Sequence, residues 1–128
     1  MNNTYIPLAR ALLAWFPRRL HAAESGVLYL SQDGYSYRMY TTDATKRTSH
    51  AGAAAFCTGL GAGWGLVPYW DTSAYTAVRK LCADYQYTCW LQRQESDTLC
   101  PLMAADGSRQ MQGCEQDVRF VCRKQDSS

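Results

Sequence analysis

The sequence predicts one α+β domain in which two helices precede the main group of short antiparallel strands. Three observations lead to this fold class. The chain has 128 residues, 47% of them are hydrophobic, and the apolar residues recur at helical spacing and then at strand spacing. A chain of this size is expected to form one domain, and this composition can bury a hydrophobic core. Because no run of about 18 apolar residues occurs, we expect no membrane span in this chain.

Two strands and a helix are expected first. Residues 26–30 form a short apolar run, and residues 35–40, which follow an Asp-Gly turn signal, alternate as in a strand with two faces. Thr48 or Ser49 can cap a helix that runs to about Gly59, after which further glycines end it.

A second helix and further strands are expected next. Residues 64–67 form a brief apolar segment that Pro68 stops. Asp71 or Thr72 caps the second helix, whose apolar residues share a face at i, i+4, i+7 and i+8 from Ala74. Short strands are then predicted at 87–91, 99–103 and 118–122, with an Asp-Gly hairpin turn at 106–107.

Charge is distributed unevenly along the chain. Residues 1–25 carry three Arg against one Glu, whereas residues 26–128 carry ten Lys and Arg against ten Asp and Glu. A protein that binds nucleic acid normally concentrates Lys and Arg on one face, where they displace counterions from phosphate. The neutral body therefore argues against a nucleic-acid partner.

The cysteines indicate the compartment. Six of them occur, all in the C-terminal 60% of the chain, and no C-x2-C pair is present. This pattern favours three disulfides in an extracellular or secreted protein over a zinc site. Six cysteines allow 15 pairings, and their spacing alone does not choose among them.

The chain divides into three expected segments. Residues 26–124 form the domain, and residues 125–128 form a polar tail. Residues 1–25 fit an atypical secretory signal, a linker or the end of a fragment better than a transit peptide. In the fragment interpretation, the chain is one module of a larger protein.

An ordered set of residues resembles the C-type lectin-like domain. His50, Ala53 and Cys57 stand where that family carries an aromatic residue, an Ala and a Cys on its first helix. Trp90 and Leu91 match the start of its central strand. The resemblance covers about residues 26–124. Some short sequence segments also resemble lectin-like modules that accompany scavenger-receptor cysteine-rich modules in green algal surface proteins.

The last two cysteines extend this resemblance. Cys114 and Cys122 have the family's spacing, and the segment 120–123 resembles its closing strand. The resemblance implies a disulfide-stapled lectin-like fold. Its implied pairings are Cys57 with Cys122 and Cys100 with Cys114, which leaves Cys82 to Cys89.

The resemblance also indicates where a calcium-dependent sugar site lies in this family. Members with that site carry a long loop with a Pro, and an Asn and Asp before the fourth core Cys, because Ca²⁺ takes six to eight oxygens. Here only nine residues, 91–99, separate Trp90 from Cys100, and none is Pro. Arg109, Gln110 and Met111 occupy the second set of positions. We therefore expect no metal, no cofactor and no calcium-dependent sugar binding of the usual kind.

Enzyme motifs are missing from the sequence. It contains no nucleophile elbow, zinc-protease helix, P-loop or dinucleotide fingerprint, and an even number of cysteines leaves no spare thiol. His50 is interpreted as a packed side chain. The sequence thus predicts a non-catalytic binding protein.

Two functions remain open. The first is an extracellular recognition or assembly module that binds a protein partner through exposed Tyr and Trp side chains and the 91–99 loop. The alternative is a calcium-independent lectin in which an aromatic ring stacks on a sugar. The candidate ligand-binding residues are Tyr69, Trp70, Gln94, Glu95 and Arg109. Exposure of Trp70 beside polar side chains favours a sugar, and a wide apolar patch favours a protein.

Overall fold

The computed structural model describes residues 26–41 and 47–126. The segment expected at 1–25 and the last two residues of the expected tail lie outside this part of the chain. The strands of the described part are β1 (Val27–Gln32), β2 (Tyr35–Tyr40), β3 (Trp64–Leu66), β4 (Cys89–Trp90), β5 (Cys100–Met103), β6 (Arg109–Gln112) and β7 (Arg119–Gln125). The two α-helices are α2 (His50–Thr58) and α3 (Tyr75–Leu81).

The hairpin of β1 and β2 follows from its turn. Asp33 and Gly34 have φ values of 54° and 83°, and the strands pair directly on either side of them, with Gln32 opposite Tyr35. A two-residue turn with both φ values positive has the twist that an antiparallel hairpin requires, and Asp-Gly is a favoured sequence for it. The expected strand pair is therefore confirmed.

Strand β7 lies at the centre of the sheet, whose order is β1-β2-β7-β4-β5-β6 with β3 also paired to β7. β2 pairs with one edge of β7, while β3 and β4 pair with different parts of the other edge. The pair β4–β7 is parallel, although the sequence predicts antiparallel strands. The parallel pair arises because about 28 residues, with the β5–β6 hairpin, separate β4 from β7, long enough for a crossover.

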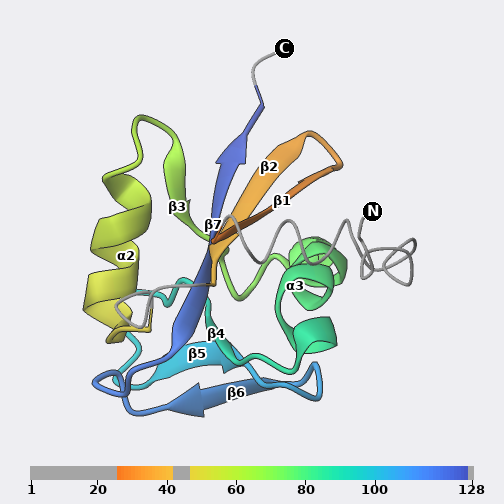
Figure 1. Ribbon diagram of the computed structural model, residues 1–128. Coiled ribbons are helices and arrows are strands. Elements are labelled where there is room, and N and C mark those ends of the chain that lie inside the picture. The colour runs from red at the N-terminus through yellow and green to blue at the C-terminus, as the bar shows by residue number, and fades with distance from the viewer. Residues whose placement is uncertain (1–25, 42–46, 127–128) are drawn as a thin grey trace.

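The alternation of side chains along β7 creates two cores, one on each face of the sheet. Phe120 and Cys122 pack in the core beneath α2, whereas Val121 packs in the core beneath α3. Figure 1 shows α2 and α3 on opposite sides of β7. Each helix thus covers its own face of the sheet.

The two helices begin in different ways. The Ser49 hydroxyl accepts a hydrogen bond from the Gly52 amide at 3.2 Å, so Ser49 caps α2 as one of the two expected candidates. α3 follows a 3₁₀ turn, Thr72–Ala74, that starts after Asp71, whose side chain makes no cap hydrogen bond. The Asp71 carboxylate instead accepts from the Ser73 hydroxyl and, at 2.7 Å, from Arg123. These two donors lower the pKa of Asp71.

Three strands differ from their expected extents. β4 covers only two of the five residues predicted at 87–91. The hairpin turn expected at 106–107 joins β5 to β6, but no strand is predicted at the residues of β6, because they are mostly polar. β7 continues to Gln125, and the Asp126 amide donates to the Gly34 carbonyl at 2.8 Å. The tail expected from 125 therefore begins inside a strand.

All six cysteines are disulfide-bonded, and the pairing is the one that the resemblance implies. The bonds are Cys57–Cys122, Cys82–Cys89 and Cys100–Cys114. The first ties α2 to the central strand, the second ties the end of α3 to β4, and the third closes the β5–β6 hairpin. Each bond thus links two elements that meet in the fold.

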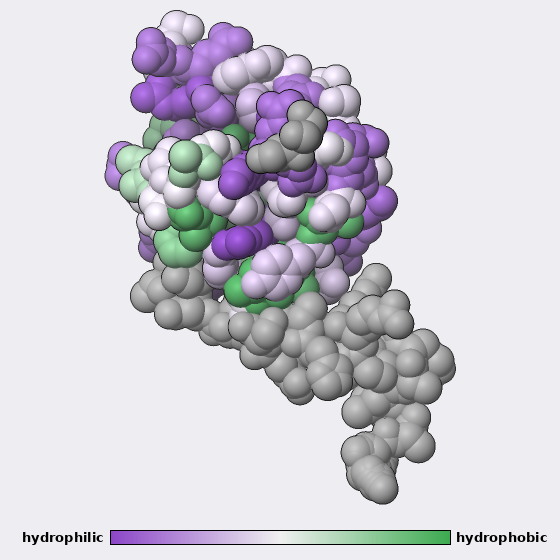
Figure 2. Space-filling view, turned by 90° about the horizontal axis from the view of Figure 1, so that it is seen from above, coloured by the Kyte–Doolittle hydropathy of each residue, from purple (hydrophilic) through white to green (hydrophobic). Residues whose placement is uncertain are grey.

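The surface is predominantly polar on the face that Figure 2 shows, where hydrophobic residues form small, separate patches. Among the described residues, the exposed large hydrophobic side chains are Tyr29, Trp70 and Leu99, which come from three different parts of the sequence. No described helix is long and apolar enough to cross a membrane.

Candidate functional site

Three of the five predicted ligand-binding residues lie together. The guanidinium of Arg109, on β6, lies 4.9 Å from the centre of the Tyr69 ring, and this ring meets Trp70 edge to face at 5.5 Å. Trp70 retains 49% of its surface exposed. We call these three residues the aromatic–arginine cluster.

Two hydrogen bonds hold the backbone of Tyr69, the central residue of the aromatic–arginine cluster. The Tyr69 amide donates to the Gln92 carbonyl at 3.1 Å, and the Tyr75 hydroxyl donates to the Tyr69 carbonyl. Burial raises the pKa of Tyr75, and the nearby positive charge of Arg109 partly offsets this shift. The Tyr75 hydroxyl therefore stays neutral and remains a donor at ordinary pH.

Gln94 and Glu95 lie in the loop 91–99, and among the described residues no hydrogen bond or ion pair joins them to the aromatic–arginine cluster. Arg93 organises this loop, because its Nη1 donates to the Asp97 carbonyl at 2.7 Å and lies within 3.4 Å of two other loop carbonyls. The Gln94 amide donates to the Asp97 carboxylate at 3.1 Å. Both predicted side chains are exposed. The structure thus separates the predicted set into two groups.

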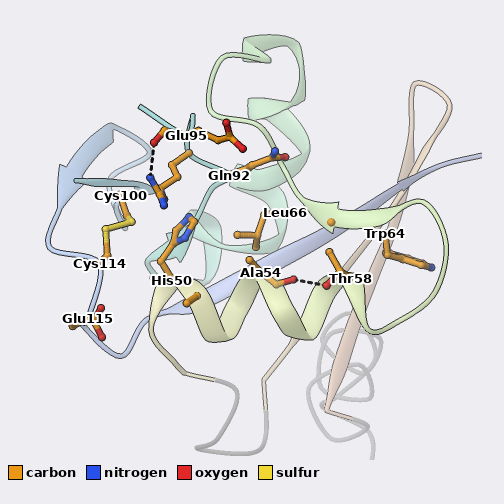
Figure 3. A pocket seen from close by; sticks show the side chains of 13 residues that line it. His50, Ala54, Thr58, Trp64, Leu66, Gln92, Glu95, Cys100, Cys114 and Glu115 are labelled. Carbon is orange, nitrogen blue, oxygen red and sulfur yellow. Dashed lines mark hydrogen bonds between the residues drawn. A yellow bond between two sulfur atoms is a disulfide. The ribbon is translucent and has the colours of Figure 1, made fainter. Parts of the chain in front are cut away.

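Glu95 lines a cavity of about 660 Å³ instead (Figure 3). His50, Ala54 and Thr58 lie four residues apart on α2 and line one wall, since residues at this spacing share a helix face. In Figure 3, His50 lies between Leu66 and the disulfide that joins the β5–β6 hairpin. The small alanine side chain leaves room for the cavity, whose size is typical of small-molecule sites.

His50 is set apart from the other lining residues by its burial, because it is a polar side chain with only 6% of its surface exposed. Its Nε2 is 2.7 Å from the Leu91 carbonyl, and its ring meets Trp90 edge to face at 5.3 Å. Because a carbonyl only accepts, Nε2 carries the proton in this hydrogen bond. Burial lowers the pKa of His50, against the opposing effect of its hydrogen bond to Leu91. The bonding of His50 is that of a packed side chain, as the sequence predicts.

The lowered pKa of His50 predicts a pH-dependent stability. The unfolded chain binds a proton near the ordinary pKa of 6.5, but the folded chain does so only at lower pH. The free energy of unfolding therefore falls as pH drops below 6.5 and is fully retained above it. We expect the difference in unfolding free energy between wild type and His50→Gln to shrink from pH 7.5 to pH 5, measured in urea. A pH-independent difference contradicts this prediction, since other titrating groups cancel.

No family model and no curated protein sequence matches this chain. Solved structures do match. Botrocetin is 21% identical over 76% of this chain and 95% of its own, with a TM-score of 0.57. The snake venom toxin convulxin is 14% identical over 78% and 96%, with a TM-score of 0.60, and rhodocetin is 19% identical over 76% and 96%, with a TM-score of 0.58. The described domain has the C-type lectin-like fold.

In this lectin-like domain, the positions expected for calcium ligands lie on β6. Arg109 and Gln110 are exposed, and the Arg109 Nη1 lies 3.7 Å from the Met111 sulfur. A cation and a thioether offer no oxygen donors to Ca²⁺. Within 26–41 and 47–126, no group of three or more His, Cys, Asp or Glu side chains lies close enough to hold a metal ion.

Sequence reasoning did not find the cavity or a second aromatic–cation contact at Arg38. His50 and Trp64 line the cavity although they lie on a helix and a strand that no motif connects. Arg38 lies 4.5 Å from the centre of the Trp64 ring. Only the face of Arg38 could have been predicted. The alternation in residues 35–40 places Arg38 on the face of its strand opposite the buried Tyr37 and Met39.

Proposed function

We propose that this lectin-like domain is an extracellular recognition module that binds a protein partner without calcium. Its contact surface comprises the aromatic–arginine cluster and the adjoining 91–99 loop. The observation that carries the proposal is the fixed stack of Arg109 on Tyr69, with Trp70 half exposed beside it. Trp, Tyr and Arg are the side chains that most often dominate the binding energy of protein interfaces.

The rigidity of this surface supports the proposal. Tyr69 is held through Gln92 and Tyr75, and the loop is held through Arg93. Side chains that are already ordered lose less conformational entropy when a partner binds. The surface is therefore preorganised for association.

The cavity adjoins this surface at Gln92. This residue lines the cavity, and its carbonyl accepts a hydrogen bond from the Tyr69 amide. Two exposed carboxylates, Glu95 and Glu115, line the cavity with one cation, Arg93, so these charged side chains sum to a net negative charge. This charge arrangement suits a Lys or Arg side chain of the partner. The partner is thus expected to present a basic side chain at this edge.

Similar folds are known in protein complexes. Botrocetin has been solved in a complex with the von Willebrand factor A1 domain, and rhodocetin has been solved in complex with the integrin alpha2-A domain. The three disulfides of the chain fit an oxidising compartment. These findings support the extracellular, protein-binding and non-catalytic parts of the proposal, and the replacement of oxygen donors at Arg109 and Met111 supports calcium independence.

A second candidate, sugar binding without calcium, is favoured by one specific observation. The exposed ring of Trp70 lies beside the charged Arg109 and the polar edge of β6, and the apolar surface around it is not extensive. A ring in this setting can stack on the C–H face of a sugar while polar groups bind its hydroxyls. Gln94 and Glu95 lie outside the cluster and take no part in this form of the site.

One pair of arrays distinguishes the two candidates. The full oxidised chain is applied to immobilised extracellular protein domains and to immobilised glycans, each with calcium and with EDTA. We expect a protein ligand that binds equally in both buffers. Trp70→Ala and Arg109→Ala should each weaken its binding at least tenfold, as expected for central interface residues. Lys80→Ala serves as the control, because it removes one positive charge from the exposed side of α3.

The outcomes separate clearly. EDTA-sensitive binding contradicts calcium independence, and undiminished binding of Trp70→Ala contradicts the proposed surface. Glycan binding that is lost in Trp70→Ala, without any protein ligand, supports the second candidate in place of the first. Recovery of affinity in Trp70→Tyr shows that an aromatic ring, rather than the fold, is what the partner requires.

A further inference from the structure

A second polar groove lies on the α2 side of the sheet, beyond the helix. It has a volume of about 310 Å³, and its lining includes residues from four strands, β1, β2, β3 and β7. The register sets Tyr29 opposite Arg38, and it sets Ser36 opposite both Ser31 and Lys124. Trp64 in turn pairs with Lys124. The pairing therefore brings these side chains together on one face of adjacent strands.

The helix leaves this part of the sheet uncovered. Phe56 of α2 packs edge to face on Tyr40 at 4.9 Å and on Phe120 at 5.3 Å, which fills the sheet face near one end of β2. Toward the other end, the same face carries the short side chains of Ser31 and Ser36. Small residues on an uncovered sheet face produce the groove.

Arg38 lies between two aromatic rings in this groove. Its guanidinium carbon is 5.7 Å from the centre of the Tyr29 ring and 4.5 Å from that of Trp64. No described residue accepts a hydrogen bond from Arg38 or forms an ion pair with it. Within the described part of the chain, cation–π contacts thus hold the side chain in place, and no acceptor there occupies its N–H donors.

Lys124 adds a second cation. Its aliphatic stem lies beside Gly63, where a Cβ would come within 3.5 Å of the Lys124 Cγ, and Gly63 has a φ of 86°. No described carboxylate pairs with Lys124. Asp126 also lines the groove, but its carboxylate already accepts from the Ser36 hydroxyl at 2.6 Å. Two cations against one hydrogen-bonded carboxylate leave a net positive charge.

From these observations, we infer that the groove is a calcium-independent binding site for an anionic saccharide, one that carries a carboxylate or sulfate group. The planar fork of Arg38 matches either anion, and Lys124 adds a point charge. Tyr29, which is 68% exposed, offers its ring to the apolar face of a sugar, and the serine hydroxyls suit sugar hydroxyls. None of Tyr29, Arg38 and Lys124 belongs to the partner surface or lines the cavity, so either site can fail alone.

The test is a calorimetric titration of the full chain with three tetrasaccharides of equal length. They are a heparin-derived sulfated one, an oligogalacturonate and neutral maltotetraose, all in EDTA. We expect one or both anionic probes to bind, and maltotetraose to bind at least tenfold more weakly. The preference between the two anionic probes identifies sulfate or carboxylate as the recognised group. Raising the salt concentration should weaken binding, because the site is exposed to solvent.

Matched variants assign the binding to the groove. Arg38→Gln and Tyr29→Ala should each lower the affinity for the anionic probe at least tenfold. Lys80→Gln, which also removes one positive charge, should leave this affinity unchanged. Arg38→Lys should retain part of the affinity, since it keeps the charge but loses the planar fork. An equal loss in Lys80→Gln, or full affinity in Arg38→Gln, overturns the site. Tighter binding of a tyrosine-sulfated peptide than of either saccharide overturns the saccharide assignment.

Discussion

Replacing Cys57 and Cys122 together by alanine is expected to lower the free energy of unfolding by about 4 kcal/mol. The two cysteines lie 65 residues apart in the sequence, and in the chain-entropy model a cross-link of this span removes that much conformational freedom from the unfolded chain. Both side chains are fully buried in the core beneath α2. The loss is a large fraction of the 5–15 kcal/mol that typically stabilises a domain.

The Cys82–Cys89 bond provides a matched control. Its cysteines are equally buried but lie only 7 residues apart, so the same model gives about 2 kcal/mol for their replacement by alanine. Urea unfolding of the three proteins, followed by far-UV circular dichroism, measures both losses. Equal losses in the two double variants contradict the argument from loop length.

Trp90→Ala is expected to destabilise the domain by about 3–5 kcal/mol, the usual range for removal of a buried aromatic side chain. Trp90 has no exposed surface, and it is the largest of the fully buried side chains. It contacts His50, and its indole N–H donates to the Thr48 carbonyl at 2.8 Å. The substitution therefore leaves a cavity where β4 meets α2.

Two further variants separate the causes. Trp90→Phe keeps a ring but loses the N–H donor, and the Thr48 carbonyl still accepts from Val118 at 3.0 Å. The hydrogen bond itself is thus expected to contribute about 1 kcal/mol. Trp70→Ala, at a half-exposed ring, should cost at most about 1 kcal/mol. Urea unfolding followed by circular dichroism checks the order, and a cost for Trp70→Ala equal to that of Trp90→Ala contradicts it.

The same central strand explains why the two proposed surfaces are separate. The saccharide groove takes Lys124 from the end of β7 that pairs with β2 and β3, whereas the other end of β7 pairs with β4. From β4 the sheet continues to β5 and β6, which carries Arg109 of the partner surface. The two surfaces are therefore built on opposite ends of one sheet, and binding at one need not block the other.

Local features were predictable where neighbouring residues decide them. Asp33 and Gly34 accept positive φ, and this favours a tight two-residue hairpin turn between the flanking strands. Ser49 caps α2 because its hydroxyl reaches the amide three residues later. The disulfides are a different case, since the spacing allowed 15 pairings and only the resemblance to a known family chose the observed one.

The candidate site was predictable only in part. An exposed Trp beside a Tyr can be proposed from residue type, but the stacking of Arg109 on Tyr69 joins positions that only the packing of β6 beside the segment after β3 brings together. Glu95 was grouped with the aromatic residues, yet the loop bonded through Arg93 carries it to the cavity. The direction of a side chain in such a loop depends on which loop carbonyls Arg93 reaches, and residue type alone does not indicate this.

By itself, the sequence determined the fold class, the hairpin, both helices and the absence of a spare cysteine, because these depend on short-range spacing and on composition. Only the tertiary structure decided the parallel pairing of β4 with β7, the polar edge strand β6 and the placement of Arg38 between Tyr29 and Trp64. The parallel pairing joins segments far apart in the chain, and the contact of Arg38 with Trp64 requires that β2 and β3 both pair with β7. β6 pairs only with the neighbouring β5, but its mostly polar residues carry no apolar alternation that would predict a strand.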